Sequence, residues 1–92
     1  MQTKHLSLEQ RYGIFRIDDA FLRNEPEVAL DVMKLFLVTR AHYDMCSRAV
    51  EYTAMSTLFP KMPAGTTPFE YEIIITRHDD HIVDVKAERL YT

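Results

Sequence analysis

His78-Asp79-Asp80-His81 is the densest cluster of potential metal-ligand side chains in the chain. Imidazoles and carboxylates are ligands that divalent transition metals accept. However, neighbouring side chains in a tight turn point in divergent directions, and Asp is favoured in turns for conformational reasons. We therefore expect a turn at these residues, with no metal site and no cofactor.

Cys46 is the single cysteine, and His42 precedes it by four residues, a spacing that makes two side chains neighbours on a helix. A nucleophilic cysteine needs a lowered pKa and an accessible thiolate. Cys46 falls in an apolar stripe of the helix predicted below, where a buried and inert thiol is expected. Isolated Gly13 and Gly65 do not make a phosphate-binding loop. The sequence predicts no catalytic residue, so we expect that the protein is not an enzyme.

The composition is typical of a globular protein, with 92 residues, 47% hydrophobic, 27% charged and a net charge of −3. A chain of this length predicts one domain, residues 1–92. No Lys/Arg cluster favours nucleic acid. The sequence contains no run of about 18 apolar residues, so it predicts no membrane span. It also has no apolar stretch near the N-terminus, so it predicts no signal peptide. One cysteine suits a reducing, cytoplasmic location.

The first predicted element is a helix that begins at Leu8. Ser7 followed by Gln10 has the form of a capping box, in which each side chain satisfies a backbone amide of the first turn. Gly13 would cost this helix about 1 kcal/mol relative to Ala. Residues 12–17 also have the composition of a β-strand, which is the competing interpretation. The cap favours the helix.

A long second helix is predicted over residues 24–59. Asn24 is a suitable N-cap, Glu27 stands at the capping-box position, and Pro26 falls in the first turn, where its missing N–H costs little. Pro60 ends the helix, because the residue before a proline is disfavoured in helical geometry.

This helix would be apolar on two faces, whereas a surface helix of a monomer needs one apolar face. One stripe contains Val28, Val32, Leu35, Tyr43, Cys46 and Val50, and the other contains Leu30, Leu37, Ala41, Met45, Tyr52, Met55 and Phe59. Met33 and Leu37 interrupt the strip of polar residues between these two stripes. We therefore expect a surface that binds a protein partner or a second copy, formed by Met33, Leu37, Ala41, Met45 and Tyr52.

A β-hairpin is predicted at the C-terminal end, because apolar and polar residues alternate over residues 69–76 and 82–87. A two-residue turn at Asp79-Asp80 would set Ile75 against Asp84. A three-residue loop over residues 78–80 instead pairs Ile75 with Val83 and brings Glu72 opposite Lys86, which is favourable across strands.

These elements predict an α+β fold, with a short N-terminal helix, a long central helix and a C-terminal antiparallel β-hairpin packed on that helix. We expect a non-catalytic, small soluble interaction protein, homo-oligomeric, that binds or inhibits a macromolecular partner, as small accessory proteins of phages and mobile elements do. The partners expected are another copy of the chain and an unidentified protein, with no nucleic acid and no membrane. The alternative function is a binder of a small anionic ligand or nucleotide, with Tyr12, Arg16, Arg40 and Tyr43 lining a pocket at an oligomer interface.

Overall fold

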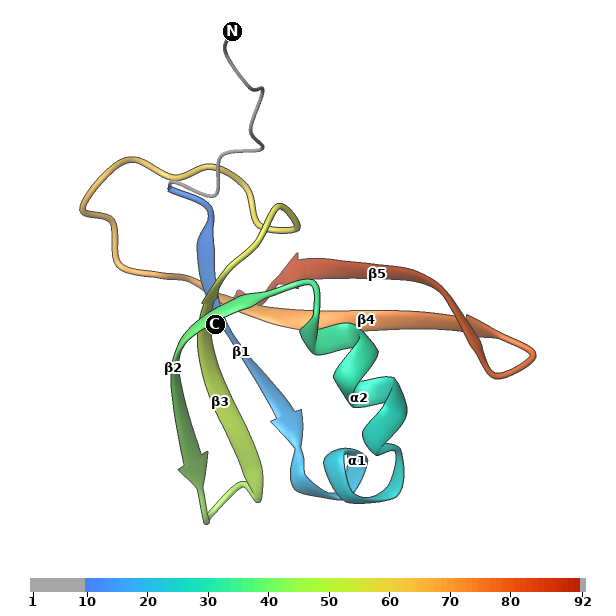
Figure 1. Cartoon of the computed structure of the whole chain (residues 1–92). Helices are drawn as coiled ribbons and strands as arrows, with labels where there is room; N and C mark the ends of the chain where they lie inside the picture. The colour runs from blue at the N-terminus through green and yellow to red at the C-terminus, as the bar shows by residue number, and fades with distance from the viewer. Residues whose placement is uncertain (1–9, 92) are drawn as a thin grey trace, which may run out of the picture.

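The computed structural model describes residues 10–91, which form a mixed β-sheet and two short helices. In chain order the elements are β1 (Tyr12–Asp18), α1 (Asp19–Asn24), α2 (Pro26–Met33), β2 (Leu37–Asp44), β3 (Ala49–Met55), β4 (Glu70–His78) and β5 (His81–Arg89) (Figure 1). The predicted α+β fold with a long central helix is therefore wrong, because the described residues form five strands and two short helices, with no long helix among them.

β1 shows the two-residue period of a strand that is buried on one face. Gly13, Phe15 and Ile17 are buried, whereas the residues between them are less so. Aligning these three side chains requires a period of two, which a helix does not provide. The strand interpretation of residues 12–17 is therefore confirmed, and the preferred helix is wrong. The cap predicted at Ser7 lies outside the described residues.

The strands follow the order β2-β3-β1-β4-β5 across the sheet. Neighbouring strands are antiparallel except β1 and β4, which run parallel and pair only at Ile14 with Glu70 and Phe15 with Tyr71. Beyond these two pairs the strands separate, so that the β4–β5 hairpin extends away from the other three strands (Figure 1). The sheet is therefore split along the second half of β1.

The predicted long helix begins near its expected start but is only eight residues long. Pro26 does occupy the first turn of α2, but Asn24 ends α1 instead of capping the longer helix. α2 ends at Met33, and the rest of the predicted helix forms β2, a turn and β3. In that turn the backbone N–H of Cys46 donates to Oδ1 of Asp44 at 3.0 Å.

The geometry of β3 explains why apolar residues of this segment fall into two stripes when they are placed on a helix. In the register of β3 with β1, Val50, Tyr52 and Ala54 lie opposite Ile17, Phe15 and Gly13. Successive side chains of a strand point to opposite faces, so these three residues of β3 share the face of the core. Apolar residues that fall on two sides of a helical projection lie on one side of this strand.

The C-terminal hairpin is confirmed, but the predicted three-residue loop is wrong. His78 pairs with His81 across a two-residue turn, in which Asp79 and Asp80 have φ of 50° and 65°. Positive φ at both positions is typical of the turn whose twist matches a hairpin. A register shift after Thr76 then pairs Ile75 with Val85 instead of Asp84. A bulge thus keeps the charge away from Ile75, and Lys86 lies opposite Ile74 instead of Glu72.

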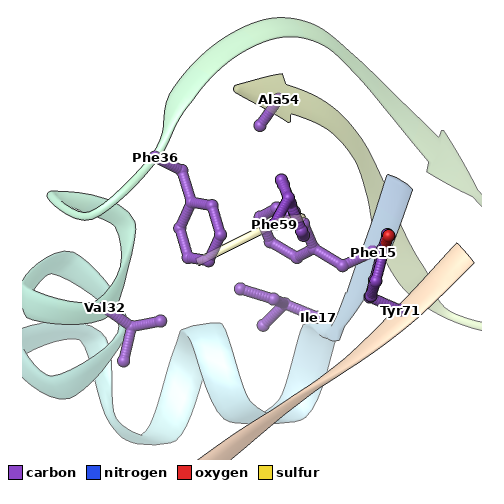
Figure 2. Close-up of a cluster of buried hydrophobic side chains, with 7 residues drawn as sticks. All are labelled: Phe15, Ile17, Val32, Phe36, Ala54, Phe59 and Tyr71. Carbon is purple, nitrogen blue, oxygen red and sulfur yellow. The ribbon is translucent and has the colours of Figure 1, made fainter. Parts of the chain in front are cut away.

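The core lies between the sheet and the two helices. Its buried members are Phe15, Ile17, Val32, Phe36, Ala54, Phe59 and Tyr71, and Figure 2 shows their side chains converging from β1, α2, β3, β4 and the connections. The ring of Phe15 lies 4.5 Å from that of Phe36, centroid to centroid. Val32 of α2 belongs to this cluster, and Phe21 and Leu22 of α1 pack against it, so both helices lie against the core.

Candidate functional site

The edge strand β2 is the most exposed strand of the sheet. Seven of its eight residues are exposed, and it forms one end of the sheet order. Leu37 is 56% exposed and Tyr43 46% exposed, although both are large and apolar or aromatic. An edge strand presents unpaired backbone N–H and C=O groups, to which another chain can hydrogen-bond. β2 therefore combines open backbone groups with exposed apolar side chains.

The opposite edge of the sheet, β5, carries more charge. It contains Asp84, Lys86, Glu88 and Arg89 along its nine residues. Charged side chains on an edge strand discourage pairing with a second chain. β2 contains Arg40 and Asp44 as its fully charged residues. Of the two edges, β2 is the better candidate for contact with another polypeptide.

The five residues predicted to bind a partner divide into two groups. Leu37 and Ala41 lie on exposed β2, and Met45, 79% exposed, lies in the turn that follows it. Met33 and Tyr52 are only partly exposed and pack against the core, with the ring of Tyr52 5.4 Å from that of Phe15. Three of the five residues therefore share one edge of the molecule, and the other two contribute to folding.

The four residues predicted to bind an anionic ligand do not converge. The hydroxyl of Tyr12 donates to the carbonyl of Thr66 at 2.7 Å. The hydroxyl of Tyr43 lies 3.5 Å from Oδ2 of Asp19. Arg40 pairs with Thr53, whereas Arg16 lies on β1. Each of the four side chains has different neighbours, so these residues do not line a common pocket.

Arg16 is already matched by a carboxylate. Its Nη2 and Nε donate to Oε2 of Glu51 at 3.0 and 3.3 Å. The hydrogen bond and the charge of Glu51 raise the pKa of Arg16, and the charges of Glu70 and Asp44 add to this effect. A guanidinium surrounded by carboxylates has little positive field left for an anion. This arrangement weakens the case for an anionic ligand at Arg16.

A hollow of about 310 Å³ opens where β1 and β4 separate, and we call it the β1–β4 slot. Apolar side chains from both strands and both helices form its floor, namely Ile17, Phe21, Val32, Ile73 and Ile75. Its rim is polar and consists of Arg16, Asp18 and Glu72. A smaller hollow of about 190 Å³ adjoins it and shares Arg16 and Glu72. Sequence reasoning missed this site, because no local signal places β4 beside β1.

One ion pair holds β4 against the helices that border the slot. Nη1 of Arg77 lies 2.6 Å from Oε1 of Glu25, at the junction of α1 and α2. The hydrogen bond from Arg77 lowers the pKa of Glu25, and the charge of Arg77 acts in the same direction. This contact joins residues that are 52 positions apart in the chain.

We predict that this pair makes stability depend on pH in the acid range. Because the pKa of Glu25 is lower in the folded protein, its contribution is present above the unfolded pKa of about 4.3 and is lost as the pH falls through the lowered folded value. Glu25→Gln should therefore flatten the loss of stability below about pH 5 in urea unfolding monitored by circular dichroism. Glu27→Gln, in the first turn of α2, is the control and should retain the slope of the parent protein. An unchanged slope in Glu25→Gln would contradict the prediction.

The cluster predicted from its ligand-type side chains forms the β4–β5 turn. His78 and Asp79 are both exposed, with Nε2 and Oδ2 3.3 Å apart. Within residues 10–91, no group of three or more His, Cys, Asp or Glu side chains is placed to hold a metal ion.

Cys46 is free and exposed, so its predicted burial is wrong, and His42 lies on β2 instead of one helical turn away.

Comparison with models of protein families, with curated proteins and with solved structures finds no match for this chain. In the part of the chain that the structure describes, neither helix has the length and apolar character that crossing a membrane requires.

Proposed function

We propose that the protein is a non-catalytic interaction module that binds another polypeptide along the open edge of β2, and that a second copy of the chain is one such partner. The observation that carries this proposal is the exposure of β2, which ends the sheet and displays Leu37, Val38 and Tyr43 to solvent. Met45 extends the same edge into the β2–β3 turn.

The basis for this function differs from the one the sequence suggested. The apolar surface does not belong to a long helix, because Leu37 and Ala41 lie in β2, Met45 lies in the turn after it and Tyr52 lies in β3. Met33 and Tyr52 are not part of the proposed contact surface, because they pack against the core. Leu37, Ala41 and Met45 remain in it.

The proposed mode of binding is the addition of a strand to the sheet. Main-chain hydrogen bonds to the free side of β2 supply affinity, and alternate side chains supply specificity. Two copies related by a two-fold axis would bring the same edge of each together, as in most homodimers. A protein partner that the module inhibits would use the same edge. The exposed thiol of Cys46 is compatible with the reducing, cytoplasmic location that forms part of this proposal.

Matched substitutions on the two edges of the sheet test the proposal. Val38 on β2 and Val83 on β5 are 37% and 60% exposed, and each adjoins a register shift of its strand. An inward-pointing charge on an edge strand opposes pairing. We expect Val38→Lys to weaken self-association by about tenfold or more, and Val83→Lys to leave it unchanged.

Light scattering over a range of protein concentrations measures this effect. The parent protein should exceed the mass of one 10.8 kDa chain at high concentration, and Val38→Lys should approach that mass. A parent protein that stays at the mass of one chain would contradict self-association, and equal effects of both lysines would contradict the assignment to β2.

A further inference from the structure

We propose that the β1–β4 slot binds a small apolar molecule that carries a positively charged ammonium group. This inference concerns a different surface from β2 and does not rest on the proposed function. It follows from the shape of the slot, from the apolar character of its floor and from the charges on its rim.

The slot exists because two parallel strands pair briefly and then separate. β1 and β4 share only the pairs at Ile14 and Phe15, and β4 then runs away from β1 (Figure 1). Phe21, Ile73 and Ile75 line the resulting gap and remain partly exposed, although they pack against the core. Apolar side chains are therefore accessible through an opening in the sheet.

The size and lining of the slot suit a small ligand. Its volume of about 310 Å³ lies at the lower end of the range typical of ligand pockets, about 300–1,000 Å³. Such pockets combine an apolar lining with a small number of polar groups that orient the ligand. Here the apolar groups form the floor and the charged groups lie at the rim, so an elongated molecule with one charged end matches both.

The rim selects the sign of that charge. Arg16 is paired with Glu51 at 3.0 Å. Within the described residues, Asp18 and Glu72 have no cationic side chain within ion-pair distance. The rim together with Glu51 thus carries three carboxylates and one guanidinium.

The position of Glu72 on the sheet supports the same conclusion. It lies directly opposite Glu88 on β5, and like charges at this position of an antiparallel pair destabilise each other. Lys86, the lysine on β5, pairs with Ile74 instead. A cation bound at Glu72 would relieve this repulsion, whereas an anion would increase it. The complementary ligand is therefore an alkylammonium.

Three probes of equal chain length test the inference by NMR titration of the ¹⁵N-labelled protein. Hexylammonium should cause saturable shifts of amides that border the slot. Hexanol should bind at least about fivefold more weakly, because it can make only a neutral hydrogen bond to the rim carboxylates, and hexanoate about tenfold more weakly, because those carboxylates repel it. Equal affinities for all three probes, no saturable binding, or shifts confined to β2 would each overturn the proposal.

Variants locate the charge recognition. Glu72→Gln should weaken hexylammonium binding by about tenfold, and Glu72→Lys should make hexanoate the preferred probe. Asp84→Asn is the matched control, a carboxylate farther along the hairpin that does not line the slot. Its effect should be less than about twofold, because salt screens distant exposed charges. An equal loss of affinity in Asp84→Asn and Glu72→Gln would overturn the proposed site.

A second pair of variants separates this inference from the proposed function. Ile73→Trp should block the slot and abolish binding while circular dichroism shows a folded protein. Val38→Lys, which targets the β2 edge, should leave hexylammonium binding unchanged. If Ile73→Trp unfolds the protein, the probe preference of Glu72→Lys tests the site instead, because this substitution changes the charge of an exposed side chain without filling the hollow.

Discussion

Phe15→Ala is expected to lower the free energy of unfolding by about 3–5 kcal/mol, the largest effect of any substitution considered for this chain. Phe15 is 1% exposed and sits at the centre of the core. Its ring lies 4.5 Å from that of Phe36, 5.4 Å from that of Tyr52 and 6.4 Å from that of Phe59. Truncation removes contacts to the α2–β2 connection, to β3 and to the segment after β3 together. Most domains have a total stability of only about 5–15 kcal/mol, so this variant should be close to unfolding.

Ile14→Ala provides the matched control, because Ile14 is the neighbour of Phe15 on the opposite face of β1 and is only partly buried. Its cost should be about 1 kcal/mol, in line with a partly buried aliphatic side chain. Urea unfolding followed by circular dichroism gives both values, and an unchanged slope with urea confirms that the unfolding transition remains comparable. Equal costs at residues 14 and 15 would contradict the burial of one face of β1.

The C-terminal hairpin was predictable because its determinants are local. Alternating side chains over residues 69–76 define a strand, and Asp79-Asp80 favours a turn. The loop length was wrong because a bulge after Thr76 was not considered. The reason for rejecting a two-residue turn was that it would place Ile75 opposite Asp84, and the bulge removes that conflict. Register in a hairpin thus depends on bulges as well as on the turn.

The central region was predicted wrongly because caps and prolines were given more weight than the period of the pattern. Pro26 and Pro60 mark a possible start and end, but they do not show that one helix fills the interval. A predicted helix with two apolar faces is itself a sign of the wrong period. Val50, Tyr52 and Ala54 alternate along β3, and Asp44 stabilises the turn before it. This alternation was available in the sequence.

The β1–β4 slot was beyond prediction because it depends on a long-range parallel pairing. Arg16 was identified from its residue type, but its neutralisation by Glu51 requires the β1–β3 register. The hairpin pattern places Glu72 opposite Lys86, and nothing in that pattern places it beside β1. Its place beside β1 arises from the contact of Phe15 with Tyr71, residues from opposite ends of the chain. No local pattern contains that information.

Gly13→Ala should destabilise the protein by about 1–3 kcal/mol, the cost typical of an overpacked core. A Cβ atom at this position would lie 2.7 Å from two ring atoms of Tyr71 and 3.0 Å from the ring of Phe59. Tyr71 is 3% exposed and Phe59 is fully buried, with the two ring centroids 4.7 Å apart, so an added methyl group would meet two closely packed rings. A glycine within a strand marks the close approach of another group, and here that group is the Tyr71 ring.

A double-mutant cycle distinguishes this steric cost from a loss of backbone freedom. In a Tyr71→Leu background the ring that meets the added methyl group is absent, so Gly13→Ala should cost at least about 1 kcal/mol less than in the parent protein. If backbone conformation were the cause, the cost would be the same in both backgrounds. Unfolding free energies of the four proteins give the coupling directly. A large coupling would confirm that glycine at position 13 is required by the close approach of the Tyr71 ring of β4 to β1.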